Sequence, residues 1–499
     1  MKLTSLLHGI DCTLNGPQVQ GEQDIKGIAY DSRLVKPGFL FIALAGHHTD
    51  GNKFVNDALA AGATAVMSQE KLTQEAISSI VVENPLAAMA QVSSRFYGHP
   101  DKNLLMIGIT GTNGKTTITY LMESILNRAG LPAGVLGTIN YRYGEHSCPA
   151  PNTTPQSADV YRILSDMVKH EQKSAVLEVS SHALSLGRVS GIEFDCALFT
   201  NLTRDHLDFH HTMEEYFQAK AKLFTNLAPG KKSFPKFAII NTDDQWGKTL
   251  AGLVRQATVV TYGIHGKPQV RAEYIRSSSK GTEFVLVAPQ GHRKVHLQLL
   301  GQHNVYNALA SAACALSAGI PLETVVEGLE KAPHVPGRLE KVEAGQPFTV
   351  VVDYAHTDDA LMNVLTALKK LSPSRLITVF GCGGDRDRSK RPLMGEAATA
   401  QSDFVFVTSD NPRSENPDRI ALDIEVGIRR QHRNNYQVIL DREQAIATAI
   451  HMARKGDIVL IAGKGHETYQ IIGDQKIHFN DTEIARKYLR DVHKHNVAI

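Results

Sequence analysis

Short apolar runs alternate with longer segments of helical periodicity over most of the chain. The runs LLMIGIT (104–110), SAVLEV (174–179), DFVFV (403–407) and DIVLI (457–461) predict buried strands. The segment ITYLMESILNRAG (118–130) places its apolar residues at helical spacing and predicts a helix. Strands that are joined through helices run parallel, so the pattern predicts an α/β protein with largely parallel sheets.

One segment departs from this pattern. Residues 270–299, VRAEYIRSSSKGTEFVLVAPQGHRKVHLQL, alternate polar and apolar positions and contain glycine turns. Such alternation is typical of antiparallel strands with one exposed face. The segment therefore predicts antiparallel strands inserted into the parallel scheme.

The chain divides into three blocks at two polar, proline-containing joints. A length of 499 residues exceeds what one hydrophobic core usually supports. The joints are RFYGHPDKN (95–103) and KAPHVPGRLE (331–340). They predict domains at about residues 1–100, 101–335 and 336–499.

Composition excludes several classes of protein. The 53 basic and 51 acidic side chains give a formal charge of +2, which disfavours nucleic acid or an anionic membrane as the main partner. The five cysteines form no CxxC pair, which argues against a disulfide framework and a structural zinc site. The start lacks a secretory signal, and the uncharged stretch 303–322 is richer in Ala and Ser than a membrane span. We therefore expect a cytoplasmic protein without membrane insertion, acting as a monomer on small molecules.

A glycine-rich turn between a predicted strand and a predicted helix is the clearest chemical signal. GTNGKTT (111–117) would point backbone N–H groups and a helix N-terminus at an anion. In this arrangement Lys115 would reach the outer phosphates of a nucleotide and the Thr116 hydroxyl would bind Mg²⁺. Ile109 stands where the common G-x-x-x-x-G-K-T pattern has glycine, so the loop is a variant. The predicted ATP-binding residues of the loop are Gly111, Thr112, Asn113, Gly114, Lys115, Thr116 and Thr117.

The variant loop GITGTNGKTT resembles the ATP loop of the Mur ligases and the related folylpolyglutamate synthases, which form amide bonds using ATP. Further stretches that resemble this family extend over nearly the whole chain, among them LEVSSHALSLGRV, FTNLTRDHLDFHHTMEEYFQAKAKLF, GQHNVYNALA, VVDYAHTDDAL, FGCGGDRDRSKRPLMG and AGKGHETYQ. The resemblance implies three α/β domains. These are an N-terminal domain for a uridine nucleotide, a central P-loop ATPase-type domain with a parallel sheet, and a Rossmann-like C-terminal domain for an amino acid.

The family also implies metal and carboxylate chemistry. Glu178 ends the predicted strand SAVLEV, where an α/β site places an acidic Mg²⁺ ligand, although a structural role at a strand end is the alternative. The resemblance makes His206 a ligand of a second magnesium ion and Lys220 a carbamylated lysine (N6-carboxylysine). Lys222 is close enough for the alignment to slip. A substrate carboxylate would take the γ-phosphoryl group of ATP, and an amine would attack the acyl phosphate.

Several more residues take their expected roles from the resemblance. His356 and Arg338 would stabilise charge during the reaction, although a core histidine is the alternative for His356. Asn304 would face the adenine or cap a helix. Leu186 stands where a close relative has glutamine. The residues expected to hold the UDP-muramoyl-dipeptide are Tyr30, Ser32, His47, His48, Thr49, Asn152, Thr153, Thr154, Ser180 and Arg188.

The turn SDNPRSENP (409–417) follows a predicted strand and raises the question of a charged ligand. Asp-Asn-Pro is also ordinary turn chemistry. Ligands of open α/β sheets gather at the carboxyl ends of strands, which would bring this turn close to GGDRD and AGKGHE. An arginine there suits the distal carboxylate of meso-diaminopimelate, whereas it would repel the lone ammonium of L-lysine. The expected binding residues are Arg386, Asp410, Asn411, Pro412, Arg413, Gly463 and Glu467.

The leading hypothesis is therefore an ATP- and Mg²⁺-dependent amide ligase. It would join meso-diaminopimelate to UDP-N-acetylmuramoyl-L-alanyl-D-glutamate in peptidoglycan precursor synthesis. The alternatives are the same reaction with L-lysine, a folylpolyglutamate synthase, and an inactive nucleotide-binding scaffold. A scaffold would be expected to have lost Lys115, Glu178 or Lys220, and all three are present.

Overall fold

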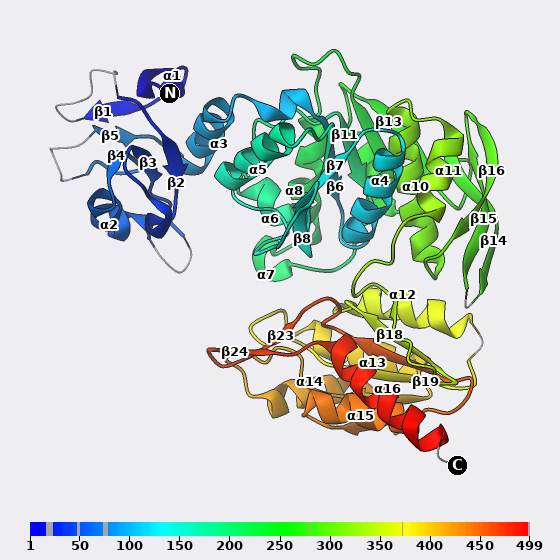
Figure 1. Ribbon diagram of the computed structural model, residues 1–499. Helices are drawn as coiled ribbons and strands as arrows, with labels where there is room; N and C mark the ends of the chain where they lie inside the picture. Colours follow the sequence, from blue (N-terminus) through cyan, green and yellow to red (C-terminus); the bar gives the residue numbers. More distant parts are fainter. Residues whose placement is uncertain (16–22, 47–49, 73–77, 279, 372, 498–499) are drawn as a thin grey trace.

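The structure is a computed structural model that describes residues 1–15, 23–46, 50–72, 78–278, 280–371 and 373–497. Three lobes follow one another along the chain (Figure 1), each built on its own sheet. The predicted α/β class with parallel sheets and three domains is confirmed. Within the described residues, no helix combines the length and the apolar character that crossing a membrane requires.

The N-terminal domain contains a five-stranded sheet in the order β1-β5-β4-β3-β2. Strands β2 to β5 pair in parallel, and β1 pairs antiparallel with β5. The strands are β1 Thr13–Asn15, β2 Gly27–Ala29, β3 Phe39–Ile42, β4 Ala63–Ser68 and β5 Ser78–Val81, and the helices are α1 Leu3–Leu7, α2 Val55–Ala60 and α3 Pro85–Phe96. Helix α3 contacts α5 of the middle domain, which joins the two lobes.

The middle domain contains an eleven-stranded sheet in the order β16-β15-β14-β13-β12-β11-β6-β10-β7-β8-β9. Its strands are β6 Leu105–Thr110, β7 Ala133–Leu136, β8 Asn140–Tyr143, β9 His146–Pro149, β10 Ser174–Glu178, β11 Cys196–Phe199, β12 Phe237–Asn241, β13 Thr258–Gly263, β14 Val270–Ser278, β15 Gly281–Ala288 and β16 Gly291–Leu297. Its helices are α4 Lys115–Arg128, α5 Ser157–Lys169, α6 Ser181–Ser185, α7 Leu207–His210, α8 Met213–Thr225, α9 Gln245–Ala251, α10 Gln302–Ser317 and α11 Leu322–Glu330.

Successive residues of the central strand β6 enter two different cores, as a strand buried on both faces requires. Ile107 packs with α4 and α10 on one face, whereas Met106 packs with α5 and α8 on the other. The uncharged stretch 303–322 begins in α10, whose apolar residues are buried in the first of these cores. The predicted antiparallel insertion is confirmed, because β14, β15 and β16 pair antiparallel at one edge of the sheet.

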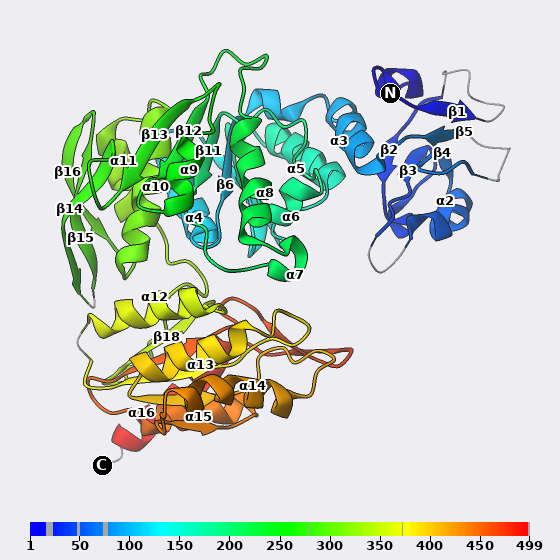
Figure 2. The same cartoon turned by 180° about the vertical axis from the view of Figure 1, so that it is seen from behind.

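The C-terminal domain contains a six-stranded sheet in the order β17-β18-β22-β19-β20-β21, parallel except for β17. Its strands are β17 Glu340–Lys341, β18 Thr349–Asp353, β19 Leu376–Phe380, β20 Phe404–Val407, β21 Tyr436–Val438 and β22 Ile458–Ala462, and a separate hairpin comprises β23 Tyr469–Ile472 and β24 Gln475–His478. Its helices are α12 Asp358–Lys369, α13 Lys390–Gln401, α14 Pro417–Arg430, α15 Arg442–Met452 and α16 Asp481–Val497. Helix α12 lies on the side of this domain that faces the middle domain in both views (Figures 1 and 2).

Candidate active site between the middle and C-terminal domains

The phosphate-loop candidate connects β6 to α4 and requires glycine at two positions. Gly111 and Gly114 have φ values of 141° and 92°, a region that other residues rarely adopt. A Cβ on Gly111 would lie 1.9 Å from Thr200 Oγ1, and one on Gly114 would lie 2.4 Å from Asn307 Oδ1. The end of β11 supports the loop, since Thr200 Oγ1 donates to Asn113 O at 2.6 Å. This geometry fits a close approach of backbone to a phosphate.

Two lysine amines meet at one carbonyl of this loop. Lys115 Nζ donates to Gly111 O at 2.9 Å and to Thr112 O at 2.8 Å, while Lys220 Nζ from α8 donates to Gly111 O at 2.9 Å. Burial lowers the pKa of both amines, and the nearby Lys115 charge lowers the pKa of Lys220 further. Lys220 is 1% exposed. Burial therefore favours the neutral form of the Lys220 amine over the charged form. The neutral amine is the form that reacts with carbon dioxide.

Glu178 forms the centre of a compact polar group at the end of β10. Its carboxylate accepts from Thr138 N at 2.8 Å, from Thr138 Oγ1 at 2.9 Å and from Thr116 Oγ1 at 3.1 Å. Arg338 Nη2 donates to the same Thr116 hydroxyl at 3.3 Å. A hydroxyl and a carboxylate side by side at the end of a phosphate loop are suitable ligands for Mg²⁺, with phosphate and water as the remaining ligands. Thr138 was not predicted, because it lies 40 residues from Glu178 in a loop without a motif.

His206 lies in a cluster of imidazoles beside Tyr216. Its ring is 4.9 Å from that of His182, and His182 is 5.6 Å from His210 between ring centres. Burial lowers the pKa of His206 to about 3, against the opposing pull of Asp205. The imidazole is therefore neutral at pH 7 and offers a lone pair. Among the described residues, no three His, Cys, Asp or Glu side chains converge as a protein-only metal site, so a metal near His206 would need phosphate or water ligands.

Four histidines, one buried and three half-buried, predict a loss of stability in acid. Burial lowers the pKa values of His206 and His466 to about 3 and of His210 and His303 to about 4, from an ordinary value of 6.5. The unfolded chain therefore binds more protons than the folded protein between about pH 6.5 and 4, so stability rises with pH across this window. We expect the urea midpoint of unfolding to fall from pH 7.5 to 4.5, with a shallower fall in His303→Gln. A midpoint that does not change with pH would contradict this assignment.

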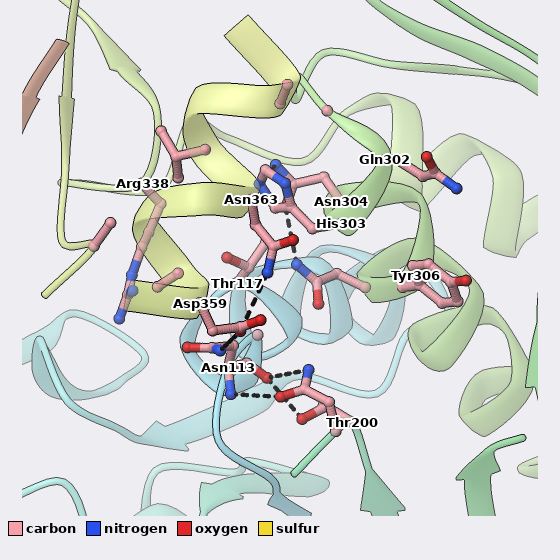
Figure 3. Close-up of a pocket in the computed structure, with 18 of the residues that line it drawn as sticks. Asn113, Thr117, Thr200, Gln302, His303, Asn304, Tyr306, Arg338, Asp359 and Asn363 are labelled. Carbon is pink, nitrogen blue, oxygen red and sulfur yellow. Dashed lines mark hydrogen bonds between the residues drawn. The ribbon is translucent and has the colours of Figure 1, made fainter. Parts of the chain in front are cut away.

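A cavity of about 690 Å³ opens beside the phosphate loop and is lined by both domains (Figure 3). Asn304 lies on its wall, and its Nδ2 donates to Leu300 O at 2.8 Å rather than capping α10, whose N-cap residue is Gly301. Across the cavity, Asn113 Nδ2 of the loop donates to Asp359 Oδ2 of α12 at 3.0 Å. Asp359 was missed by the sequence analysis, since 246 residues separate it from Asn113.

His356 and Arg338 also line this cavity. His356 Nδ1 lies 2.9 Å from Tyr354 O, and a carbonyl can only accept, so Nδ1 carries the proton and Nε2 is an acceptor without a partner among the described residues. Burial and the nearby Lys390 lower the pKa of this imidazole. The Arg338 guanidinium lies 4.7 Å above the Tyr354 ring. The structure thus brings both predicted residues to the phosphate-loop side of the C-terminal domain.

The segment predicted to hold the muramoyl-peptide lies next to Glu178. Thr154 Oγ1 donates to Glu178 O at 2.8 Å, Ser180 N donates to Thr154 Oγ1 at 3.1 Å, and Arg188 Nη1 donates to Thr154 O at 2.9 Å. Thr153 Oγ1 is 3.1 Å from Thr138 Oγ1, and Asn152 is exposed. Leu186 is half-buried at the end of α6. These contacts join the segment to the metal candidate through one strand end.

Two further predicted residues lie in the N-terminal domain. Tyr30 Oη donates to Asp159 Oδ2 of α5 at 2.5 Å, which links this domain to the middle one. Ser32 begins a single 3₁₀ turn, Ser32–Leu34, and is half-buried. His47, His48 and Thr49 lie outside the described residues.

The predicted amino-acid crevice is the region at the carboxyl ends of β19, β20 and β22. Asn411 Nδ2 donates to Glu467 Oε2 at 2.9 Å, and Arg413 Nη1 donates to Gly384 O at 2.7 Å. A Cβ on Gly463 would lie 2.6 Å from Asp410 Oδ2. Within the described part of the chain, Nε and Nη2 of Arg413 have no hydrogen-bond partner. Pro412 is buried and Arg386 is exposed. Arg386 lies near the predicted turn, because a Cβ on Gly383 would lie 3.0 Å from Arg413 Nη1 and 3.9 Å from Arg386 Cγ.

Lys464 is a member of the crevice that the sequence analysis missed. Its Nζ donates to Glu467 Oε2 at 3.0 Å and to Asn411 Oδ1 at 3.1 Å, and its side chain is fully buried. Glu467 Oε2 thus accepts from both Lys464 Nζ and Asn411 Nδ2, whereas Oε1 has no hydrogen-bond partner among the described residues. A lysine between two glycines directly after a buried strand was the available signal.

Arg442 holds the strand ends that carry these residues. Its guanidinium donates to Ser409 O at 3.3 Å and to Ala462 O at 2.9 Å, the carbonyls that immediately precede Asp410 and Gly463. It also forms a fully buried ion pair with Asp481 of α16, at 2.7 and 2.8 Å. One buried cation therefore fixes both loops of the crevice.

Arg442→Met is expected to destabilise the C-terminal domain by about 3–5 kcal/mol, because it leaves Asp481 buried without a counter-charge. Urea unfolding measures this change. The double variant Arg442→Met/Asp481→Leu removes the orphaned charge and is expected to recover most of the loss. Equal stability of the two variants would show that the unpaired carboxylate is not the cause.

Matches to protein families cover most of the chain. Residues 24–97 match the Mur ligase family catalytic domain, residues 109–315 the Mur ligase middle domain, and residues 337–465 the Mur ligase glutamate ligase domain. A protein of Solibacter usitatus is 49% identical over 470 residues, which are 94% of each chain. The chain belongs to the Mur ligase family.

Relatives of this Mur ligase share one description. The proteins of Solibacter usitatus and of Bacillus velezensis are both UDP-N-acetylmuramoyl-L-alanyl-D-glutamate–2,6-diaminopimelate ligases, and the second is 44% identical over 99% of this chain and 100% of its own. A solved structure of a ligase with that description is 35% identical, covers 99% of both chains and has a TM-score of 0.69. The MurF ligase of Thermotoga maritima in complex with ADP, 19% identical over 94% of this chain and 98% of its own with a TM-score of 0.66, shares the fold.

Proposed function

We propose that this Mur ligase joins meso-diaminopimelate to UDP-N-acetylmuramoyl-L-alanyl-D-glutamate with the energy of ATP, in peptidoglycan precursor synthesis in the cytoplasm. The observation that carries the proposal is that two groups of polar side chains lie on neighbouring domains, which share a cavity. A phosphate loop and a carboxylate lie on the middle domain, and a crevice with two arginines and two carboxylates lies on the C-terminal domain. Relatives that are 44–49% identical over nearly the whole chain are named as ligases of this reaction.

The three domains divide the ligands among them. Residues 1–100 would hold the uridine nucleotide through Tyr30 and Ser32, residues 101–335 would hold ATP, and residues 336–499 would hold the amino acid. The Tyr30–Asp159 hydrogen bond supports the first assignment, because it places the N-terminal domain beside the segment of Thr154. The cavity that both later domains line supports ATP binding, with Asn304 near the base.

Thr116 and Glu178 would hold Mg²⁺, and His206 would hold a second ion. Bound Mg²⁺ would neutralise negative charge on the phosphates and on the acyl phosphate. Lys220, once carbamylated, would present a carboxylate beside the position of its amine, which is 2.9 Å from Gly111 O. The fit rests on the Thr116–Glu178 contact of 3.1 Å at the loop.

The side chains of this site position and stabilise charge rather than attack the substrate. Lys115 would leave the loop carbonyls and bind the β- and γ-phosphates. Arg338 and the free Nε2 of His356 face the same cavity, where they would bind the transferred phosphoryl group and its oxygens. The incoming amine attacks the acyl carbon, and phosphate leaves as the amide forms.

The crevice carries a charge balance that favours diaminopimelate over lysine. Arg386, Arg413 and Lys464 oppose Asp410 and Glu467, which leaves a formal excess of one positive charge. The distal end of meso-diaminopimelate carries an ammonium and a carboxylate and is neutral overall, whereas the distal end of lysine is a cation. The free face of Arg413 suits the carboxylate, and the free Oε1 of Glu467 suits the ammonium.

Release of phosphate from ATP tests this function. We expect release to require the UDP-muramoyl-dipeptide and diaminopimelate together, in the presence of Mg²⁺. Omission of either substrate is expected to reduce the rate to the background of the Lys115→Met variant. Steady phosphate release without the amine would instead indicate an ATPase, and no release with the full mixture would indicate an inactive nucleotide-binding scaffold.

A further inference from the structure

Two exposed imidazoles face each other on the middle domain, outside the site described above. His146 begins β9, and His170 directly follows α5. His146 Nε2 and His170 Nε2 are 3.0 Å apart. His170 precedes β10 by only a few residues, so the pair lies near the amino end of that strand, opposite to the carboxyl end that carries Glu178.

The hydrogen bond of Nδ1 fixes the tautomer of neutral His170. His170 Nδ1 is 2.8 Å from the main-chain carbonyl of Asp166, which can only accept, so Nδ1 carries the hydrogen. In neutral His170 the Nε2 atom therefore accepts a hydrogen bond from His146 Nε2, which a bound ion would replace. An imidazole whose other N–H is bonded to a carbonyl is the usual arrangement of a metal-binding histidine.

Tyr143 holds the two rings in place. Its ring lies 5.1 Å from that of His146 at 29°, and 5.5 Å from that of His170. Tyr143 and His146 are paired across the turn that joins β8 to β9, so the hairpin presents both residues on one face. The geometry of the pair is thus set by three elements before any ligand arrives.

We propose that His146 and His170 form a bidentate site for a divalent late transition-metal ion of the Cu²⁺ or Ni²⁺ type, with water as the remaining ligands. Two nitrogens that bind one such ion at about 2.0–2.1 Å lie roughly 2.9–3.4 Å apart, depending on the angle between them. The observed 3.0 Å matches ligands at nearly a right angle, the tetragonal geometry of these two ions. Neutral His146 moves its hydrogen from Nε2 to Nδ1 through solvent, so binding releases no net proton.

The site is open and would tie the hairpin to the helix. No third His, Cys, Asp or Glu completes the pair among the described residues, so water fills the other positions. Both histidines are exposed, which gives the ion access. A bound ion would join β9 to the end of α5. Because β9 leads directly into residues 150–154, it would also restrain the start of the segment that contains Thr154.

Electron paramagnetic resonance of added Cu²⁺ tests the proposal on the full chain. Cys148 lies on the same face of β9, two residues from His146, and its exposed thiol binds copper itself, so the experiment uses a Cys148→Ser background with excess Mg²⁺. We expect one equivalent of Cu²⁺ with the splitting of two equatorial nitrogens. His146→Gln and His170→Gln are each expected to weaken this binding by roughly 10- to 100-fold or more, since loss of a partner outside the ligand sphere already has such an effect.

His292→Gln is the matched control, because His292 is an exposed histidine on β16. It is expected to leave the high-affinity signal unchanged. The proposal is overturned if the affinity is the same in all three histidine variants, or if the spectrum shows fewer than two nitrogens. The pair would then be a surface hydrogen bond only.

Discussion

Lys115→Met is expected to lower kcat/KM for ATP by about 10²- to 10³-fold, the loss typical of one preorganised charge at a reacting centre. The Lys115 amine now donates hydrogen bonds to Gly111 O and Thr112 O. It must break these bonds before it can bind phosphate oxygens. Methionine keeps the length of the side chain and removes the charge. The helix α4 and the glycine backbone remain, so the fold is expected to be unchanged. Steady-state kinetics with varied ATP measures the effect.

Lys115→Arg separates charge from shape. A guanidinium keeps the positive charge, but its planar fork does not fit the compact position between two loop carbonyls. We therefore expect Arg to recover only part of the lost rate. Full activity in the methionine variant would contradict the proposed binding of phosphate by Lys115 of this loop.

Lys220→Met is expected to reduce turnover by about 10²-fold or more, and to make the enzyme indifferent to bicarbonate. The buried amine has a pKa well below its ordinary value, chiefly through burial, which favours the neutral form that carbamylation requires. In the wild type we expect activity to fall in carbon dioxide-depleted buffer and to return on addition of bicarbonate. Acidification through the lowered pKa protonates the amine, so the carbamate and the activity are expected to be lost together.

Lys222→Met is the matched control on the same helix. Lys222 is exposed and two residues from Lys220, so its loss is expected to leave both turnover and the bicarbonate response unchanged. If Lys222→Met instead removed the bicarbonate response, the modified lysine would be Lys222. A wild type that ignores bicarbonate would contradict carbamylation.

Local patterns predicted those parts of the site that local chemistry specifies. The phosphate loop was predictable because glycine, lysine and threonine must follow a strand in fixed order, and Glu178 because a buried strand ends in an acid. The turn of Asp410 and Arg413 was predictable because a polar turn ends a buried strand. In each case the residue and its neighbours in sequence carry the signal.

Contacts between distant segments were not predictable. Asp359 meets Asn113 only when two domains come together, and the periodicity of α12 gives no sign of it. In the sequence, Arg442 looks like any arginine at the start of a helix. In the structure it is fully buried and forms an ion pair with Asp481. Lys464 resembles a loop lysine until its bonds to Asn411 and Glu467 are seen. Partners chosen by tertiary packing leave no periodic pattern.

The most direct test of the central claim is the choice of amine. Wild type and Arg413→Ala are incubated with the UDP-muramoyl-dipeptide, ATP, and equal amounts of meso-diaminopimelate and L-lysine. Mass spectrometry then identifies and quantifies the nucleotide products. Arg433→Ala, an exposed arginine beyond α14, serves as control. We predict almost only the diaminopimelate product from wild type and control. Arg413→Ala is expected to lose about 2–4 kcal/mol, roughly 30- to 1000-fold in kcat/KM for diaminopimelate. Equal incorporation of lysine by the wild type, or no product with either amine, would contradict the account.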